Sequence, residues 1–170
     1  TMSHNSPCGP ADPLAADAAD FVEFLKKFNP DVEIVSEAWP KLFQPDYTEV
    51  ITKVLQAKPQ AMYSALWGGD LTSFIDQASI YALFKDTQFF AVNMADYTAL
   101  TAVKNLPLGI HSGNRYLRTF PKNKANMDWG NAYFAKYKEY PTNWSWEAAV
   151  GIQFLTEAMK KTNSTDTKKL

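Results

Sequence analysis

The sequence has one cysteine and two histidines among 170 residues, and these low counts exclude several kinds of site. With Cys8 alone, the chain forms no internal disulfide and no zinc site built from clustered cysteines. His4 and His111 are too isolated to form a metal site or a catalytic triad. The sequence patterns of a nucleophile elbow, a phosphate-binding loop, a dinucleotide-binding loop and a zinc-protease helix are also missing. The sequence therefore predicts no catalytic residues, no metal and no cofactor.

The sequence also has no excess of positive charge and no long apolar run. The net charge is −1, and no basic cluster precedes Lys168 and Lys169, so nucleic acid is not an expected partner. No apolar run reaches the roughly 18 residues that a membrane span requires. The chain does not begin with the basic and then apolar pattern of a secretory signal. Its composition, 46% hydrophobic and 21% charged, is that of an ordinary globular domain.

After an unpatterned start at residues 1–13, which we expect to be unstructured or extraneous, helix-like and strand-like segments alternate. Apolar spacing predicts a helix from Leu14 to Phe28, and Val32–Val35 alternates like a strand. Asp46 is expected to cap the next helix, with Glu49 completing a capping box. Further strands are expected at 61–66, 88–92 and 109–117, with helices after Asp70 and at 97–104. This order predicts an α/β fold with a Rossmann-like parallel sheet and helices on both faces.

The last third of the chain has a different pattern, because two helical segments follow each other without a strand between them. They are expected at about residues 126–140 and 144–161. Both have broad apolar faces, and such faces need a partner surface. We therefore expect association through exposed apolar helices.

The segment from 61 to 78, AMYSALWGGDLTSFIDQA, contains the most informative junction in the sequence. An apolar strand ends at Trp67, Gly68 and Gly69 turn the chain, and a helix starts at Asp70. In an open α/β sheet such a junction lies at the carboxyl end of a strand, where small ligands bind. Free N–H groups at the helix start, beside an exposed indole, suit a carboxylate with an apolar body. Packing of Trp67, a simple tight turn and helix capping by Asp70 are the alternative interpretations.

Several longer stretches resemble the type I periplasmic binding proteins of ABC importers, especially the branched-chain amino acid and amide group. These stretches are LKKFNPDVEIVSEAW, PDYTEVITKVLQAKPQAMYSALWGGDLTSFIDQA, QFFAVN and WEAAVGIQFLTEAMKKTNSTD, which together with the opening helix cover roughly residues 14–166. Members of this family have two Rossmann-like lobes that enclose a solute. The resemblance implies that residues 14–116 form the second, ligand-binding lobe. It also implies that residues 117–170 form a crossover and a helical pair belonging to the partner lobe.

The resemblance also implies which residues contact the solute. Trp67 is similar to the family's aromatic contact, with Gly68, Gly69 and Asp70 forming the turn beside it. Asn93 corresponds to a position where amino acid binders often carry an acidic residue for the substrate ammonium group. Asparagine supplies no such charge, so either Asp96 substitutes for it or the ligand is not a free α-amino acid. Tyr97 is a weaker candidate, and packing, loop solvation or capping are the alternatives for Asn93, Asp96 and Tyr97.

The function implied by the resemblance is that of an extracytoplasmic solute-binding component, not an enzyme. Its expected partners are a small amino-acid-like, amide or organic-acid ligand and the membrane permease of an ABC importer. Its expected location is periplasmic or extracellular, soluble or lipid-anchored, with the export signal not in this chain. A receptor-like sensor or a flavodoxin-like α/β domain with a regulatory or enzymatic role is the alternative, because fold alone does not separate these functions.

Overall fold

The computed structural model of the chain describes residues 13–92 and 94–170 and divides it into two compact units. The first comprises the described residues up to 95 together with residues 99–113. The second comprises residues 96–98 and 114–170. The expected boundary between 116 and 117 lies three residues beyond the division after residue 113.

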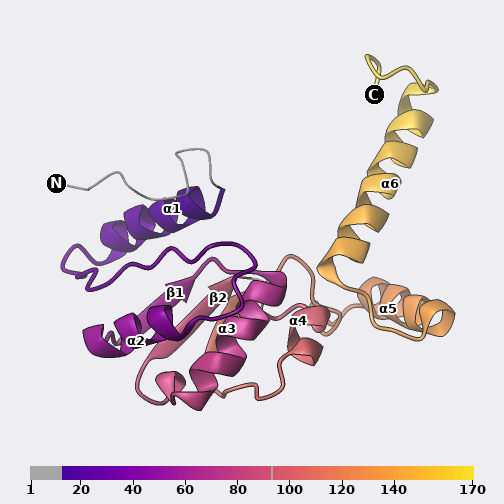
Figure 1. The fold of residues 1–170 in the computed structure, drawn as a ribbon. Helices are drawn as coiled ribbons and strands as arrows, with labels where there is room; N and C mark the ends of the chain where they lie inside the picture. The colour runs from indigo at the N-terminus through magenta and orange to yellow at the C-terminus, as the bar shows by residue number, and fades with distance from the viewer. Residues whose placement is uncertain (1–12, 93) are drawn as a thin grey trace. The chain divides into compact units, whose positions relative to one another are not determined.

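The first unit contains a three-stranded parallel sheet in the order β1-β2-β3 (Figure 1). Its strands are β1 (Ala61–Ser64), β2 (Gln88–Val92) and β3 (Ile110–Gly113). Its helices are α1 (Pro13–Phe28), α2 (Thr48–Ala57), α3 (Gly68–Ile80) and a 3₁₀ turn η1 (Leu83–Lys85). The short helix α4 (Tyr97–Ala102) belongs to the first unit from Ala99 onward.

Helices cover both faces of the sheet. Side chains alternate between the two faces along each strand, so one strand presents side chains to both layers. Met62 and Phe89 share one face and pack into the core formed with α2 and α3. Tyr63 points to the opposite face and stacks on Phe21 of α1, with ring centroids 3.9 Å apart. Figure 1 shows α1 on one side of the strands, with α2 and α3 on the other. The predicted parallel sheet with helices on both faces is therefore confirmed.

The expected strand at Val32–Val35 is wrong, since the structure has no strand between residues 29 and 47. A strand needs a neighbour for its backbone N–H and C=O groups. Among the described residues β1 pairs only with β2, so its other edge stays open and residues 32–35 are not hydrogen-bonded to it as a strand. Their apolar side chains are correspondingly open, with Ile34 40% and Val35 54% exposed.

The expected capping box at α2 is also wrong. The N-cap is Tyr47, which has no side-chain capping bond, and the helix begins at Thr48. Asp46 Oδ1 accepts instead from the backbone N–H of Thr48 at 2.8 Å. A bond from the Thr48 side chain, and after it this backbone bond, lower the pKa of Asp46. The carboxylate thus shapes the turn before the helix, one position too early to cap it.

The second unit contains the helices α5 (Lys124–Tyr137) and α6 (Asn143–Thr162), which confirm the two successive helices expected there. A capping box that was not predicted starts α6, where Thr142 and Ser145 each bond the other's backbone N–H. The apolar side chains of α6 are widely exposed, including Trp144 at 56% and Phe154 at 73%. Within the described part of the chain, no helix combines the length and apolar character of a membrane span.

Candidate functional site

The turn between β1 and α3 presents an exposed indole beside open backbone. Trp67 is the N-cap of α3 in an extended conformation, and its side chain is 51% exposed. Gly68 has a φ of +55°, a conformation that favours glycine. A Cβ at either Gly68 or Gly69 would meet no atom of the described residues within 4 Å, so packing against that part of the chain does not require either glycine. The described residues thus leave free space on the side of the turn where Cβ atoms of residues 68 and 69 would lie.

Asp70 lies in the first turn of α3, but its carboxylate faces the protein. It is 8% exposed, and both its oxygens accept from the backbone N–H of Phe43, at 3.0 and 3.1 Å. Oδ1 also accepts from the buried Tyr47 hydroxyl at 2.9 Å. These bonds satisfy most of the carboxylate's acceptor capacity. Asp70 lies two residues after the start of α3 and therefore holds the loop before α2 against that end of the helix.

The loop at residues 41–47 is fixed at a second point by Gln77 of α3. The Gln77 side chain accepts from Tyr47 N at 2.8 Å and donates to the Pro45 carbonyl at 3.0 Å. Burial, reinforced by the hydrogen bond to Asp70 and its charge, raises the pKa of Tyr47 far above its ordinary value. Tyr47 therefore stays protonated and serves as a hydrogen-bond donor over the whole physiological range.

Phe43, at the tip of this loop, was missed by the sequence analysis. Its φ is +59°, and its side chain is 83% exposed. Leu42 beside it is 53% exposed. The signal that marks this position is an apolar pair in a loop between Pro40 and Pro45, where no helical or strand period accounts for it.

The remaining expected site residues are Asn93, Asp96 and Tyr97. Asn93 lies outside the described residues. Asp96 and Tyr97 belong to the second unit, whereas Trp67, Gly68, Gly69 and Asp70 belong to the first. Tyr97 is 38% exposed and makes an edge contact with Tyr140, with centroids 5.7 Å apart.

Asp96 is 4% exposed and connects two segments of the second unit. Its Oδ1 accepts from Thr98 N at 3.0 Å and from the Thr98 hydroxyl. Its Oδ2 accepts from the backbone N–H of Asn143, at the first turn of α6, at 2.9 Å. With its amide oriented to donate to the same oxygen, Asn143 accepts from Arg115 Nη2 at 3.2 Å. Arg115 also pairs with Glu147 at 2.9 Å. The Asp96 carboxylate is thus satisfied by protein donors.

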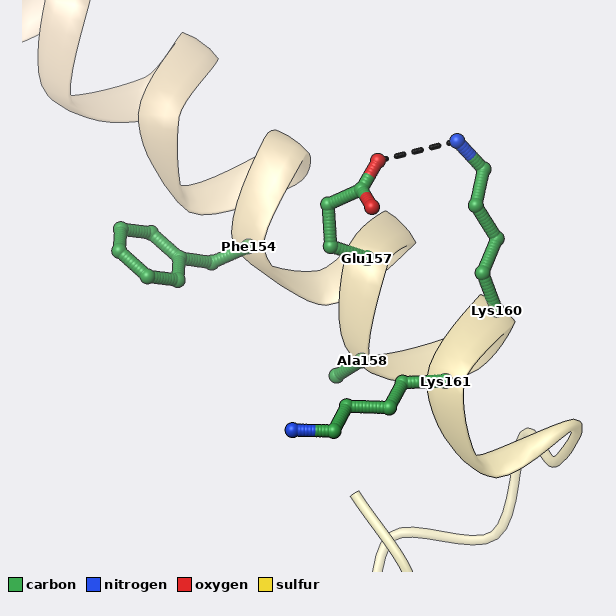
Figure 2. Close-up of a pocket in the computed structure, with 5 residues that line it drawn as sticks. All are labelled: Phe154, Glu157, Ala158, Lys160 and Lys161. Carbon is green, nitrogen blue, oxygen red and sulfur yellow. Dashed lines mark hydrogen bonds and ion pairs between the residues drawn. The ribbon is translucent and has the colours of Figure 1, made fainter.

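Two surface hollows in the second unit complete the candidates. One lies along α6 and is lined by five residues of that single helix, Phe154, Glu157, Ala158, Lys160 and Lys161 (Figure 2). Walls from one helix do not enclose a ligand, and its Glu157–Lys160 ion pair is exposed to solvent. The other, of about 530 Å³, is lined by Tyr116, Trp129 and Trp146 among others. Burial raises the pKa of Tyr116, whose hydroxyl is closed off from solvent and has no hydrogen-bond partner among the described residues.

The chain matches a protein family in sequence and resembles solved structures in its fold. A family model described as periplasmic binding protein matches residues 14–170. No curated protein shows significant sequence similarity to the chain. An amino acid ABC transporter substrate-binding protein from Pseudomonas fluorescens Pf-5 has a similar structure, with a TM-score of 0.77 and 14% identity over 89% of this chain. An ABC transporter solute-binding protein from R. palustris, solved in complex with benzoate, gives a TM-score of 0.71 and 20% identity over 91%.

The chain corresponds to only part of each of these two proteins, 40% of the first and 42% of the second. At these identities the structural likeness shows the fold alone. The predicted resemblance to a periplasmic binding protein, as a partial chain, is confirmed.

Proposed function

We propose, from the premise that this chain belongs to the periplasmic binding protein family, that it is part of an extracytoplasmic solute-binding component of an ABC importer. The family is one of binding proteins rather than of enzymes. The chain's partners are then a small solute and the importer's membrane permease, and its location is periplasmic or extracellular. Residues 14–116 form one ligand-binding lobe, and residues 117–170 belong to the partner lobe.

The observation that carries this proposal is the half-exposed Trp67 directly before two glycines that face open space at the start of α3. The indole offers an apolar wall, and the first N–H groups of the helix offer donors to an anionic or carbonyl oxygen. This combination suits an organic acid, amide or amino-acid-like solute with an apolar body. Asp70 and Asp96 shape the loops around the site, because their carboxylates are already bonded to protein donors.

The mechanism that follows is domain closure. Contacts from two lobes favour the closed state, so solute binding and shape change are linked. One lobe alone supplies part of those contacts, and we therefore expect the isolated chain to bind its solute weakly.

Saturation-transfer NMR tests the proposal, because it detects weak binding. The chain is mixed with benzoate, leucine, phenylalanine and propionamide in turn. We expect transfer of saturation from the protein to the signals of at least one of these solutes. We expect this transfer to be lost in Trp67→Ala. Trp144→Ala is the matched control, since it removes an equally exposed indole from the second unit. No saturation of any solute, or equal saturation in Trp67→Ala, would contradict the proposal.

A further inference from the structure

The Phe43 loop, residues 41–47, is held in one conformation by bonds from α3. Asp70 accepts twice from the Phe43 N–H, and Gln77 bonds both Tyr47 and Pro45. Within the loop, Gln44 accepts from Lys41 N at 2.9 Å and donates to the Asp46 carbonyl at 2.7 Å. These hydrogen bonds therefore fix the conformation of the loop and of its tip.

Two features of Phe43 at the tip are unfavourable, namely its backbone conformation and the exposure of its ring. A left-handed backbone is rare for a bulky residue, and Phe43 adopts it with a φ of +59°. Its ring is 83% exposed, so no burial inside the first unit compensates for that conformation. A glycine or asparagine would suit the same backbone better. Core packing therefore does not explain the presence of phenylalanine here.

The bonds to Asp70 also determine where the Phe43 ring is displayed. Asp70 is the third residue of α3, and Trp67 is the N-cap of the same helix. Since the Phe43 N–H lies 3.0 Å from Asp70 Oδ1, the tip of the loop is at the N-terminal end of α3. The backbone of Phe43 and that of Trp67 thus lie at the same end of α3, Phe43 through its bond to Asp70 and Trp67 as the N-cap, and both side chains are exposed.

We propose that Phe43 is a second solute-contacting residue in addition to Trp67, and that it selects solutes with a flat apolar body over purely polar ones. This assignment rests on the proposed function. Asp70 is then a positioning residue, because it holds the backbone of Phe43 and does not face the solute. The solute class is a carboxylate or amide attached to an aromatic ring, whose face packs against the Phe43 ring.

Phe43→Gly gives a sharp test, because glycine fits the observed backbone and removes the ring. We expect its urea midpoint to stay equal to or above that of the wild type, since strain relief offsets the entropy of the unfolded chain. Benzoate is expected to bind about three- to tenfold more weakly, which corresponds to the loss of one aromatic contact. Acetate, which has no ring, is expected to be unaffected. Phe24→Ala on α1 is the control, because it removes another exposed ring, 57% exposed.

The outcomes separate this inference from the proposed function. Benzoate saturation that is lost in Trp67→Ala and weakened in Phe43→Gly, but kept in Phe24→Ala, supports both. Saturation that is lost in Trp67→Ala but unchanged in Phe43→Gly overturns the assignment of Phe43 and leaves the function standing. An equal effect of Phe43→Gly on acetate overturns its selective role. No saturation of any of the four solutes in the wild type overturns the proposed function and the assignment of Phe43 with it, whereas saturation of leucine or propionamide without benzoate overturns the assignment of Phe43 alone.

Discussion

The two units of the chain differ in what holds them together. Among the described residues of the first unit, thirteen buried hydrophobic side chains from α2, α3, β2, α4 and the adjoining turns form one contiguous core. In the second, Tyr116 is buried between Trp129 and Trp146, while the side chains of Ile152 and Phe154 on α6 are 66% and 73% exposed. The first unit thus supplies both surfaces of its core. The second presents a broad apolar face whose partner surface is not among its own residues.

Buried carboxylates sharpen this contrast. Asp70 in the first unit holds a loop against a helix that is itself embedded in the core. Asp96 in the second unit fastens residues 96–98 to the first turn of α6, a helix with few buried side chains. A buried carboxylate therefore adds hydrogen bonds to a packed core in the first unit. In the second unit it connects segments where few side chains are buried.

The largest expected effect comes from removing a ring from the core of the first unit. Phe74 is fully buried and contacts the rings of Tyr47 and Phe89. Phe74→Ala should lower the free energy of unfolding by about 3–5 kcal/mol in urea titrations. Phe154→Ala on α6 should change it by less than about 0.5 kcal/mol, because this ring is already in solvent. A large decrease in the free energy of unfolding in Phe154→Ala would contradict this difference between the units, because it would show that α6 is covered in solution.

A smaller effect is expected from neutralising Asp70. Asp70→Asn weakens the charge-assisted bonds to Phe43 N and Tyr47, and should lower the free energy of unfolding by about 2 kcal/mol. Asp86→Asn, at an exposed turn, is the control and should be neutral.

Asp96→Asn offers the corresponding change in the second unit. We expect its effect to be local, with faster amide hydrogen exchange at Asn143 and the first turn of α6. A loss of stability in Asp96→Asn as large as in Asp70→Asn would contradict the difference drawn between the two carboxylates.

The smallest expected effect is a loss of stability at alkaline pH. Because the pKa of Tyr47 is raised in the folded state, folded Tyr47 keeps its proton where the unfolded chain releases it. Its contribution is fully present below about pH 10 and decreases as the pH rises above that value. Between about pH 9 and pH 11 the loss due to Tyr47 should be about 1 kcal/mol. Tyr47→Phe should reduce the loss by that amount. Equal slopes in Tyr47→Phe and the wild type would contradict the assignment.

Periodic segments were the part of the fold that the sequence predicted well. The helices at α1, α3, α5 and α6 and the three strands appear near their expected positions, because each has an apolar pattern of its own. Helix boundaries moved by a few residues, as at α3, which starts at Gly68 and not at Asp70. Val32–Val35 failed for a different reason. Its strand-like pattern is real, but a strand forms only beside a partner.

For the candidate site, the sequence identified the turn with its indole and glycines but not the directions of the carboxylates. Asp70 and Asp96 follow strands, as ligand-contacting residues often do, and no local pattern tells that both are bonded to protein donors. The partner of Asp70 is 27 residues away at Phe43, and the partner of Asp96 is 47 residues away at Asn143. Only the folded chain brings such residues together.

The family, the alternation of helices and strands and the turn at Trp67 could all be predicted from the amino-acid sequence, because they depend on local periodicity and on short runs of residues. Long-range contacts in the folded chain set the roles of Asp70 and Asp96 in holding loops, leave residues 32–35 unpaired, and bring the backbone of Phe43 to the start of α3. The physical reason is the same in each case. Hydrogen bonds and strand pairing between distant segments depend on where the core places their partners, and local sequence does not contain that information.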